Sequence, residues 1–245
     1  MDEGPGIVKL EKFSDNIWIA QQKLRALGLE VGTKMTIIDT TGNGDLFIHS
    51  PIIITEKLKK EIAALGIVRF IVAPNRFHHL FLKQAQSLYP QAKIYAVPGL
   101  IPKRSDIANL NVLDNNLTYP WSKTIKHHLI GGAPLLNECA FFHSKSGTLL
   151  LTDIAINFGH SAAPLTKIAM LAIGHFNKFG PSIFEKLIFI RDKKLFDASI
   201  TTIMRWRFDK IIIAHGTPVK ENGYELFRSK FLRKNKSTTI APGKQ

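Results

Sequence analysis

The sequence predicts an α/β fold in which two β-sheets lie face to face and helices cover their outer sides. Segments with strand character gather in two groups, one before residue 55 and one between residues 124 and 153. Strand–helix units lie between and after these groups, without internal repeats or low-complexity linkers. Two facing sheets with helices outside are one arrangement that buries the apolar faces of such elements.

The strands are predicted from short apolar or alternating runs that end at turn residues. The predicted strands are 16–22, 35–40, 45–54, 68–74, 92–98, 124–131, 137–144, 147–153 and 210–216. The turn sequence TGNG predicts a hairpin between the second and third of these strands. The strands at 124–131 and 137–144 are compatible with either direction of pairing.

The helices are predicted from apolar spacing and from residues that start or stop a helix. The predicted helices are 55–66, 79–89, 165–180 and 195–208. Thr55 is a typical N-cap for the first helix, and Gly66 is a typical residue at its end. The stretch 165–180 has no evident place in the core.

The composition is that of one large globular domain. The chain has 245 residues, of which 45% are hydrophobic and 21% are charged. We therefore expect a single domain over 1–245, with an inserted helical segment near 160–185 and a basic C-terminal tail near 228–245. The formal net charge of +14 favours anionic substrates or partners.

Cysteine usage and the N-terminus favour a cytoplasmic protein. Cys139 is the single cysteine, so no disulfide can form within the chain. The first residues are acidic where a secretory signal is basic, and no apolar core follows them. The longest apolar runs, such as 168–174, are too short to cross a bilayer, so we expect no membrane span.

Three predicted strands end in residues that are able to bind a metal ion. One runs into His78 and His79, one ends in Asp153, and one ends in His215. Ligands of open α/β sheets gather beyond the carboxyl ends of the strands, so these ends can converge. Three imidazoles and one carboxylate would complete the ligand set of one divalent ion. Zinc is the first expectation, with iron and manganese as alternatives.

The adjacent pair His78–His79 limits the local backbone conformation. On a strand the two side chains would point to opposite faces, and on a helix they would diverge by about 100°. Only a loop or the first turn of a helix allows both rings to aim at one point. Pro74 and the helical pattern from Leu80 place the pair in such a region. A pair of ordinary loop histidines is the alternative.

The order and spacing of these residues resemble the metallo-β-lactamase superfamily. Its signature opens with a strand, then T-H-x-H-x-D-H, then a helix, and the stretch APNRFHH fills this window. Pro74 and Arg76 stand at the first two histidines, His78 at the aspartate and His79 at the last histidine.

The later motifs extend the resemblance over most of residues 14–220. LLLTD resembles the strand that ends in the metal-bridging aspartate, here Asp153, and IIIAHG resembles the final histidine, here His215. His49 in LFIHSPI stands near the aspartate of the family's D-x-G motif. The pattern is similar to a bacterial branch of the fold described as a domain of unknown function. It implies a metallo-β-lactamase-like αββα sandwich.

The departures from the family pattern imply one metal instead of two. The ligands of the first metal are missing together, and the family's middle histidine has no clear counterpart. Each ligand position of the second metal holds a residue that is able to bind a metal ion: His78, His79, Asp153 and His215. We expect catalytic roles for Asp153 and for Arg76, whose charge would hold an anionic group at the vacated first site.

Four further residues are expected beside the ligands or the substrate. They are His49, Asn75, Glu138 and His143. Glu138 and His143 are five residues apart, so on one regular strand at most one of them faces the site.

The resemblance predicts a metal-dependent hydrolase, and the basic charge favours a small, anionic substrate. We expect specificity in the segment 160–195, where the chain departs most from the family core. One alternative is a protein of this fold that has lost catalysis and binds a partner, because the first metal site is missing. An RNA-processing or nucleic-acid-binding protein has less support, since no basic–aromatic stacking motif accompanies the charge.

Overall fold

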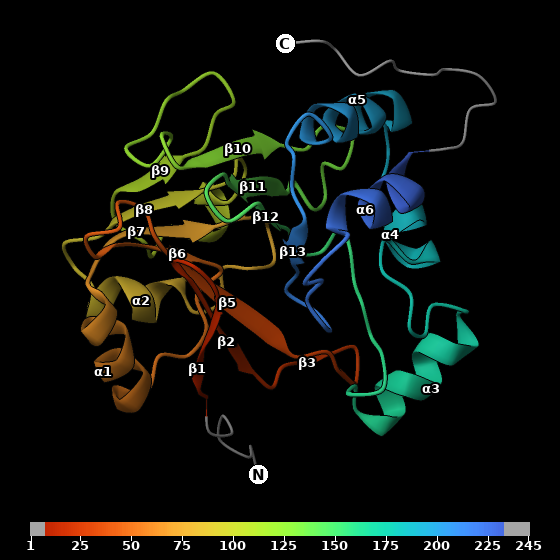
Figure 1. Ribbon diagram of the computed structural model, residues 1–245, viewed down its shortest axis with the longest axis horizontal. Coiled ribbons are helices and arrows are strands. Elements are labelled where there is room, and N and C mark those ends of the chain that lie inside the picture. The colour runs from red at the N-terminus through yellow and green to blue at the C-terminus, as the bar shows by residue number, and fades with distance from the viewer. Residues whose placement is uncertain (1–7, 233–245) are drawn as a thin grey trace.

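The computed structural model describes residues 8–232 and confirms the predicted sandwich (Figure 1). A seven-stranded sheet and a four-stranded sheet pack face to face, and helices cover both outer faces. The first sheet is formed by the N-terminal half of the chain, and the second comes from residues after 124. The αββα architecture expected from the resemblance is therefore correct.

The larger sheet is mixed and has the order β1-β2-β5-β6-β7-β8-β9. Its strands are β1 Leu10–Ser14, β2 Ile17–Gln22, β5 Thr33–Asp39, β6 Asp45–His49, β7 Ile67–Ala73, β8 Lys93–Ala96 and β9 Leu110–Val112. Pairing is antiparallel from β1 to β6 and parallel from β6 to β9. The predicted TGNG hairpin joins β5 to β6.

The smaller sheet has the order β10-β11-β12-β13. Its strands are β10 Ile125–Leu129, β11 Cys139–His143, β12 Thr148–Leu150 and β13 Lys210–Ile212. The first three pair antiparallel, whereas β12 and β13 are parallel. A separate hairpin consists of β3 Arg25–Ala26 and β4 Leu29–Glu30.

The helices lie in two groups on opposite sides of the sandwich (Figure 1). They are α1 Glu56–Leu65, α2 Leu82–Leu88, α3 Pro164–Ala172, α4 Ile183–Ile188, α5 Lys193–Ile203 and α6 Gly223–Phe231, with a short 3-10 helix at Ile101–Lys103. The first helix follows its sequence signals, since Thr55 Oγ1 accepts a hydrogen bond from the Leu58 amide and Gly66 ends the helix.

Several predicted boundaries differ from the structure. The second helix begins at Leu82, because residues 79–81 form turns before it. The stretch 165–180 is helical only in its first half, and a second short helix, α4, follows it. Residues 228–231 of the predicted basic tail belong to α6, and residues 233–245 lie outside the described part.

The central layer is an apolar cluster between the two sheets. Phe47 and Val72 from the first sheet meet Phe141 and Leu150 from the second, and all four are buried. The Phe47 ring lies 5.0 Å from the Trp121 ring and 5.6 Å from the Phe141 ring. These contacts set how the strand ends of one sheet lie against those of the other.

The outer layers use the alternate side chains of the same strands. Ile48 and Ile71 neighbour Phe47 and Val72 in sequence but belong to the cluster beneath α1 and α2. In the second sheet, Phe142 faces the cluster covered by α5 and α6. The period-2 alternation of strands thus places apolar groups on both faces of each sheet.

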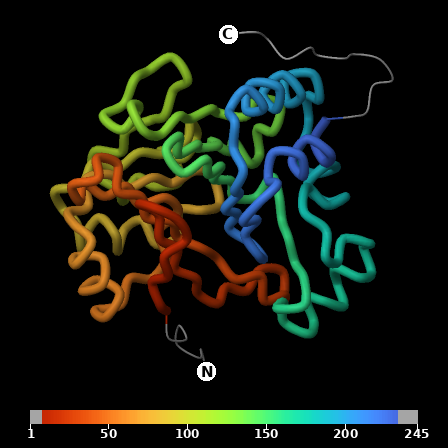
Figure 2. The backbone as a smooth tube through the Cα atoms, viewed as in Figure 1, coloured from red at the N-terminus to blue at the C-terminus, as the bar shows by residue number. Residues whose placement is uncertain are grey.

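The β3–β4 hairpin extends from the first sheet to the start of α3, as the backbone trace shows (Figure 2). Thr166 Oγ1 donates a hydrogen bond of 2.7 Å to the Glu30 carbonyl, which joins the helix to the hairpin. In the described residues no helix combines the length and hydropathy that a membrane crossing requires.

The inter-sheet cluster yields a stability prediction. Phe47→Ala removes a fully buried ring and should lower the free energy of unfolding by about 3–5 kcal/mol, measured by urea denaturation. The control is Phe184→Ala, because Phe184 is 53% exposed, and it should change the unfolding free energy by about 0.5 kcal/mol or less. Similar effects in the two variants would contradict the central position of Phe47.

Candidate metal centre

Three side chains from separate strand ends meet at one edge of the sandwich. His78 lies in the loop after β7, Asp153 follows β12, and His215 follows β13. One ligand atom from each lies within 4.8 Å of the others. The site therefore forms where the carboxyl ends of two parallel strand pairs, one in each sheet, come together.

The distances between the ligand atoms suit one small cation. His78 Nε2 lies 3.3 Å from His215 Nε2 and 3.3 Å from Asp153 Oδ1, and His215 Nε2 lies 2.9 Å from Asp153 Oδ1. A tetrahedral zinc ion with bonds of about 2.0–2.1 Å separates its ligand atoms by about 3.3 Å. Three protein ligands leave a fourth position open, which is typical of catalytic zinc sites.

The other ring nitrogen of each histidine is held by a hydrogen bond. His215 Nδ1 donates to the Gly32 carbonyl at 2.7 Å, so in the neutral ring it is Nε2, facing the site, that carries the lone pair. His78 Nδ1 lies 2.7 Å from Ser50 Oγ. Metal-binding histidines have their outer nitrogen held in this way, which sets both the orientation of the ring and its tautomer.

Asn75 connects the loop of His78 to Asp153. Its Oδ1 accepts hydrogen bonds from the amides of Phe77 and His78 at 2.9 and 2.7 Å, which shapes the loop after β7. Its Nδ2 donates to Asp153 Oδ2 at 2.6 Å and to Thr152 Oγ1 at 2.9 Å. The completely buried Asn75 therefore positions two of the three candidate ligands.

Glu138 holds the backbone of the segment that carries Asp153. Its carboxylate accepts the amides of Thr152, Asp153 and Ile154 at 2.7, 2.7 and 3.1 Å. Burial, followed by the charge of Asp153, raises the pKa of Glu138, while the amide hydrogen bonds oppose the rise. The three amides lie in successive residues, so a single side chain determines the path of this turn.

The electrostatics keep Asp153 ionised. Burial by itself would raise the pKa of Asp153, but the charge of His78 and the hydrogen bonds from His215 and His78 hold it well below its ordinary value. Burial would lower the pKa of His215, yet the hydrogen bond and charge of Asp153 raise it. The carboxylate is therefore in the form that binds a cation.

The structure does not bring His79 into this group. Its Nδ1 lies 3.2 Å from Arg104 Nη1, and the same guanidinium also donates to the His79 carbonyl. Arg104 is itself held by Asp106 through bonds of 2.8 Å. Successive residues in the turn before α2 point in different directions, so His78 faces the site while His79 faces Arg104. The pair does not converge on one point.

Arg76 lies on the wall of the same site and not between the ligands. Its Nη1 donates to the Pro134 carbonyl at 3.2 Å, and its backbone amide donates to the Leu136 carbonyl at 3.0 Å. Its buried Nε has no partner among the described residues 8–232. The charge of Arg76 therefore borders the cavity described below.

His49 and His143 lie in different parts of the structure and have different partners. His49 is 2% exposed, its Nε2 has no partner within residues 8–232, and its ring packs 5.3 Å from the Phe141 ring. Burial and then the charge of His78 lower the pKa of His49 to about 3. His143 bonds to Ser146 Oγ at 2.8 Å, at the opposite end of β11 from Glu138. Glu138 approaches the ligands and His143 does not.

Other residues at the site were not predicted from the sequence. Ser50 has a positive φ of 56°, which turns the chain directly after β6 and points its hydroxyl at His78. Ser50 belongs to the H-S-P motif, which is the signal that could have identified it. The contact of Gly32 uses its backbone carbonyl, so no residue type in the sequence could have indicated it.

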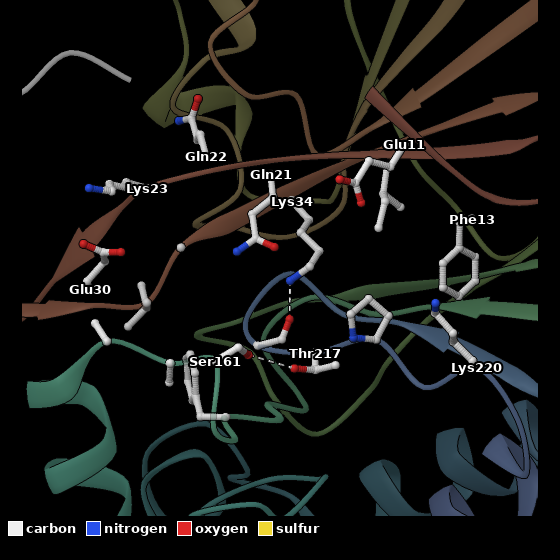
Figure 3. A pocket seen from close by; sticks show the side chains of 18 of the residues that line it. Glu11, Phe13, Gln21, Gln22, Lys23, Glu30, Lys34, Ser161, Thr217 and Lys220 are labelled. Carbon is white, nitrogen blue, oxygen red and sulfur yellow. Dashed lines mark hydrogen bonds between the residues drawn. The ribbon is translucent and has the colours of Figure 1, made fainter. Parts of the chain in front are cut away.

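Lys34 holds the backbone next to His215. It is 3% exposed, and its ammonium donates to the Gly216 carbonyl across a cavity of about 580 Å³ (Figure 3). A Cβ at Gly216, where φ is +89°, would lie 2.2 Å from the Asn157 carbonyl oxygen, so this turn needs glycine. Burial lowers the pKa of Lys34 to about 8.

A second cavity, of about 610 Å³, opens onto the candidate ligands. His78, Asp153 and His215 are among its lining residues, and most of the rest of its wall is apolar. Its size is within the range of small-molecule sites. We call it the ligand cavity.

Comparisons with known proteins agree with this geometry. The family model described as Domain of unknown function (DUF4336) matches residues 14–178. No curated protein sequence matches the chain.

Solved structures with the same fold include metallo-β-lactamases at low identity. DIM-1 metallo-β-lactamase exposed to ceftazidime has a TM-score of 0.64 and 15% identity, over 93% of this chain and 97% of that chain. A metallo-β-lactamase from Pontibacter korlensis has a TM-score of 0.60 and 12% identity, over 91% and 100%. FIM-1 from Pseudomonas aeruginosa in the mono-zinc form has a TM-score of 0.55 and 10% identity, over 90% and 92%. The resemblance seen in the sequence is confirmed at the level of the fold.

The contacts of Glu138 predict its effect on metal binding. Glu138→Gln keeps the shape but replaces one acceptor oxygen with a donor, so one amide of the 152–154 turn loses its partner. We expect zinc affinity to fall about 10- to 100-fold, measured by competition with a chromophoric chelator. The matched control is Glu61→Gln, because Glu61 accepts the Leu10 amide at 3.1 Å away from the ligands. Equal affinities in the two variants would contradict the positioning role of Glu138.

The burial of Lys34 predicts a dependence of stability on pH. The folded pKa of about 8 lies below the ordinary value of 10.5, so between these values the unfolded chain binds more protons. Stability contributed by this group should therefore rise from pH 8 to pH 10.5. Relative to Lys34→Met, wild type should gain unfolding free energy over this window in urea titrations.

The control for this pH effect is Lys178→Met. Lys178 is exposed and also donates to a glycine carbonyl, that of Gly174 at 2.7 Å. The pH-dependent difference expected for Lys34→Met should exceed the difference between wild type and this control. A constant difference between wild type and Lys34→Met would show that Lys34 does not titrate in this range.

Proposed function

The chain belongs to the DUF4336 family and has the metallo-β-lactamase fold, and on this premise we propose that it is a hydrolase that uses one divalent metal ion. The ligands are His78, Asp153 and His215. Zinc is the proposed ion, because two imidazoles and a carboxylate with an open position are typical of catalytic zinc. Iron and manganese share this ligand preference.

One observation carries the proposal: three ionisable side chains from two sheets aim their ligand atoms at one point. The three closest separations are 2.9, 3.3 and 3.3 Å. Both imidazoles are oriented from behind, by Ser50 and by the Gly32 carbonyl. A group of this kind at the floor of a cavity is a functional-site signature, since buried charges need a partner.

The bound ion would supply Lewis acidity to the scissile bond and to the attacking water. The protein groups keep the site ready for this chemistry. Asp153 remains ionised and offers Oδ1 beside both histidines, while Asn75 holds its Oδ2. We assign to Asp153 the orientation of the attacking water. We assign to Arg76, on the cavity wall, the binding of an anionic group of the substrate.

A single metal is compatible with this fold. FIM-1 was solved in a mono-zinc form, so one of the similar structures holds one zinc ion. The sequence resemblance places Pro74 and Arg76 where the family has two ligands of its first site. We therefore propose one ion per chain.

The decisive measurement is metal content per chain by mass spectrometry, on protein purified without a histidine tag. Wild type should contain about one equivalent, and Asp153→Asn and His215→Ala should lose it together with hydrolysis of a panel of ester, thioester, amide and phosphodiester substrates. The control is His79→Ala, which should retain the metal because the His79 ring bonds to Arg104. Circular dichroism checks that each variant is folded.

Each contrary result has a defined meaning. Wild type without metal after reconstitution would contradict the proposal and favour a protein that binds a partner without catalysis. Loss of metal in folded His79→Ala would restore His79 as a ligand and imply a rearrangement of the turn before α2. Bound metal without hydrolysis of any substrate in the panel would remove the catalytic part of the proposal.

A further inference from the structure

The wall of the ligand cavity is apolar over most of its extent. Ile156, Phe158 and Met170 form part of it, and each is less than 10% exposed. Phe189, directly after α4, also lines the cavity, and its ring lies 5.9 Å from the Phe77 ring. Helix α3 and the residue that follows α4 therefore contribute apolar groups to the cavity that also contains the candidate metal ligands.

The mouth of the cavity also exposes large apolar side chains. Leu27 at the tip of the β3–β4 hairpin is 102% exposed, Leu80 is 58% exposed and Phe77 is 47% exposed, and all three line the cavity. Single exposed apolar residues are ordinary on a protein surface. Several of them around one opening are typical of a binding site for an apolar ligand.

Cations surround the same opening without carboxylate partners. Arg25 from the hairpin, Lys103 after β8 and Arg76 all line the cavity. Lys103 lies 5.9 Å from the Phe77 ring centroid, and none of the three cations forms an ion pair with a carboxylate of residues 8–232. Apart from Asp153, the carboxylate on the wall is Glu185, whose Oε2 accepts the Ser182 amide at 2.7 Å.

We propose that the ligand cavity binds an amphiphilic organic anion. Its apolar chain or ring system would pack against the apolar wall, and its anionic group would bind to Arg25, Arg76 and Lys103. This inference rests on the proposed hydrolase function and names its substrate class. A neutral polar substrate would leave the apolar wall without contacts, and an organic cation would face uncompensated positive charges. A cavity of about 610 Å³ has room for a chain of about ten carbons.

The test measures binding to metal-free protein by isothermal titration calorimetry, so it does not depend on catalysis. The ligands are hexanoate, octanoate and decanoate below their micelle concentrations, together with 2-naphthoate, decanol and decyltrimethylammonium. Affinity should rise up to about fourfold per methylene along the carboxylates, since each buried methylene contributes a constant increment. Decanoate should bind more tightly than decanol and decyltrimethylammonium. Comparison of decanoate with 2-naphthoate shows whether the cavity prefers a chain or a ring.

Variants separate the two halves of the proposed ligand. The double variant Arg25→Gln/Lys103→Gln should weaken the binding of decanoate and leave the binding of decanol unchanged, because only decanoate carries a charge. The loss of affinity should be about fivefold, since both side chains are exposed at the mouth. Met170→Asp should weaken the binding of both decanoate and decanol, because it places a charge in the apolar wall. The control is Lys178→Gln with Lys186→Gln, two exposed cations outside the cavity lining, which should leave both affinities unchanged.

The outcomes distinguish this proposal from the hydrolase proposal. Affinity that is independent of chain length, or equal for decanoate and decyltrimethylammonium, would overturn the substrate class even where zinc binds and hydrolysis occurs. Binding of amphiphilic anions to a protein that takes up no zinc would preserve the ligand class and remove the hydrolase. Hydrolysis of 4-(decanoyloxy)benzoate by zinc-loaded protein faster than that of 4-acetoxybenzoate, which lacks the long chain, and of the neutral ester phenyl decanoate would support both.

Discussion

The carboxylate of Glu138 lies fully buried between β11 and the turn after β12, where it accepts three successive backbone amides. A buried carboxylate is costly unless hydrogen bonds compensate it, and here the compensating amides belong to the segment that presents Asp153. Asn75 extends this contact to the loop of His78. The positions of two candidate ligands from different sheets therefore follow from one polar connection across the sandwich.

The layered core gives this connection its rigidity. The packing of Phe47 and Val72 against Phe141 and Leu150 sets the two sheets in one arrangement, and the strand ends that carry the ligands follow from it. His215 is held from the first sheet through the Gly32 carbonyl, and the neighbouring Gly216 is held through Lys34. The candidate centre is thus a property of the interface between the sheets, which explains why its residues come from distant parts of the chain.

The segment from α3 to Phe189 and the β3–β4 hairpin form part of the wall of the ligand cavity. They supply apolar groups such as Met170, Phe189 and Leu27 around candidate metal ligands that lie at the strand ends of the sandwich. Thr166 and Glu30 tie helix and hairpin together, so the two elements form one wall. The metal chemistry proposed for the site would depend on the strand ends, whereas the proposed choice of substrate would depend on these peripheral elements.

Local patterns were sufficient to predict most strands, the Thr55-capped helix and three metal-competent strand ends, because periodicity, caps and turns depend on neighbours in the chain. They allowed two facing sheets as one arrangement, and the family resemblance selected it. Local patterns could not predict four features of the site. These are the direction of the His79 ring, the separation of Glu138 from His143, and the contacts of Ser50 and of the Gly32 carbonyl. Each depends on a partner at least 25 residues away, or on which end of a strand meets the other sheet. Sequence spacing supplied the candidate ligands, and long-range packing alone decided which of them meet.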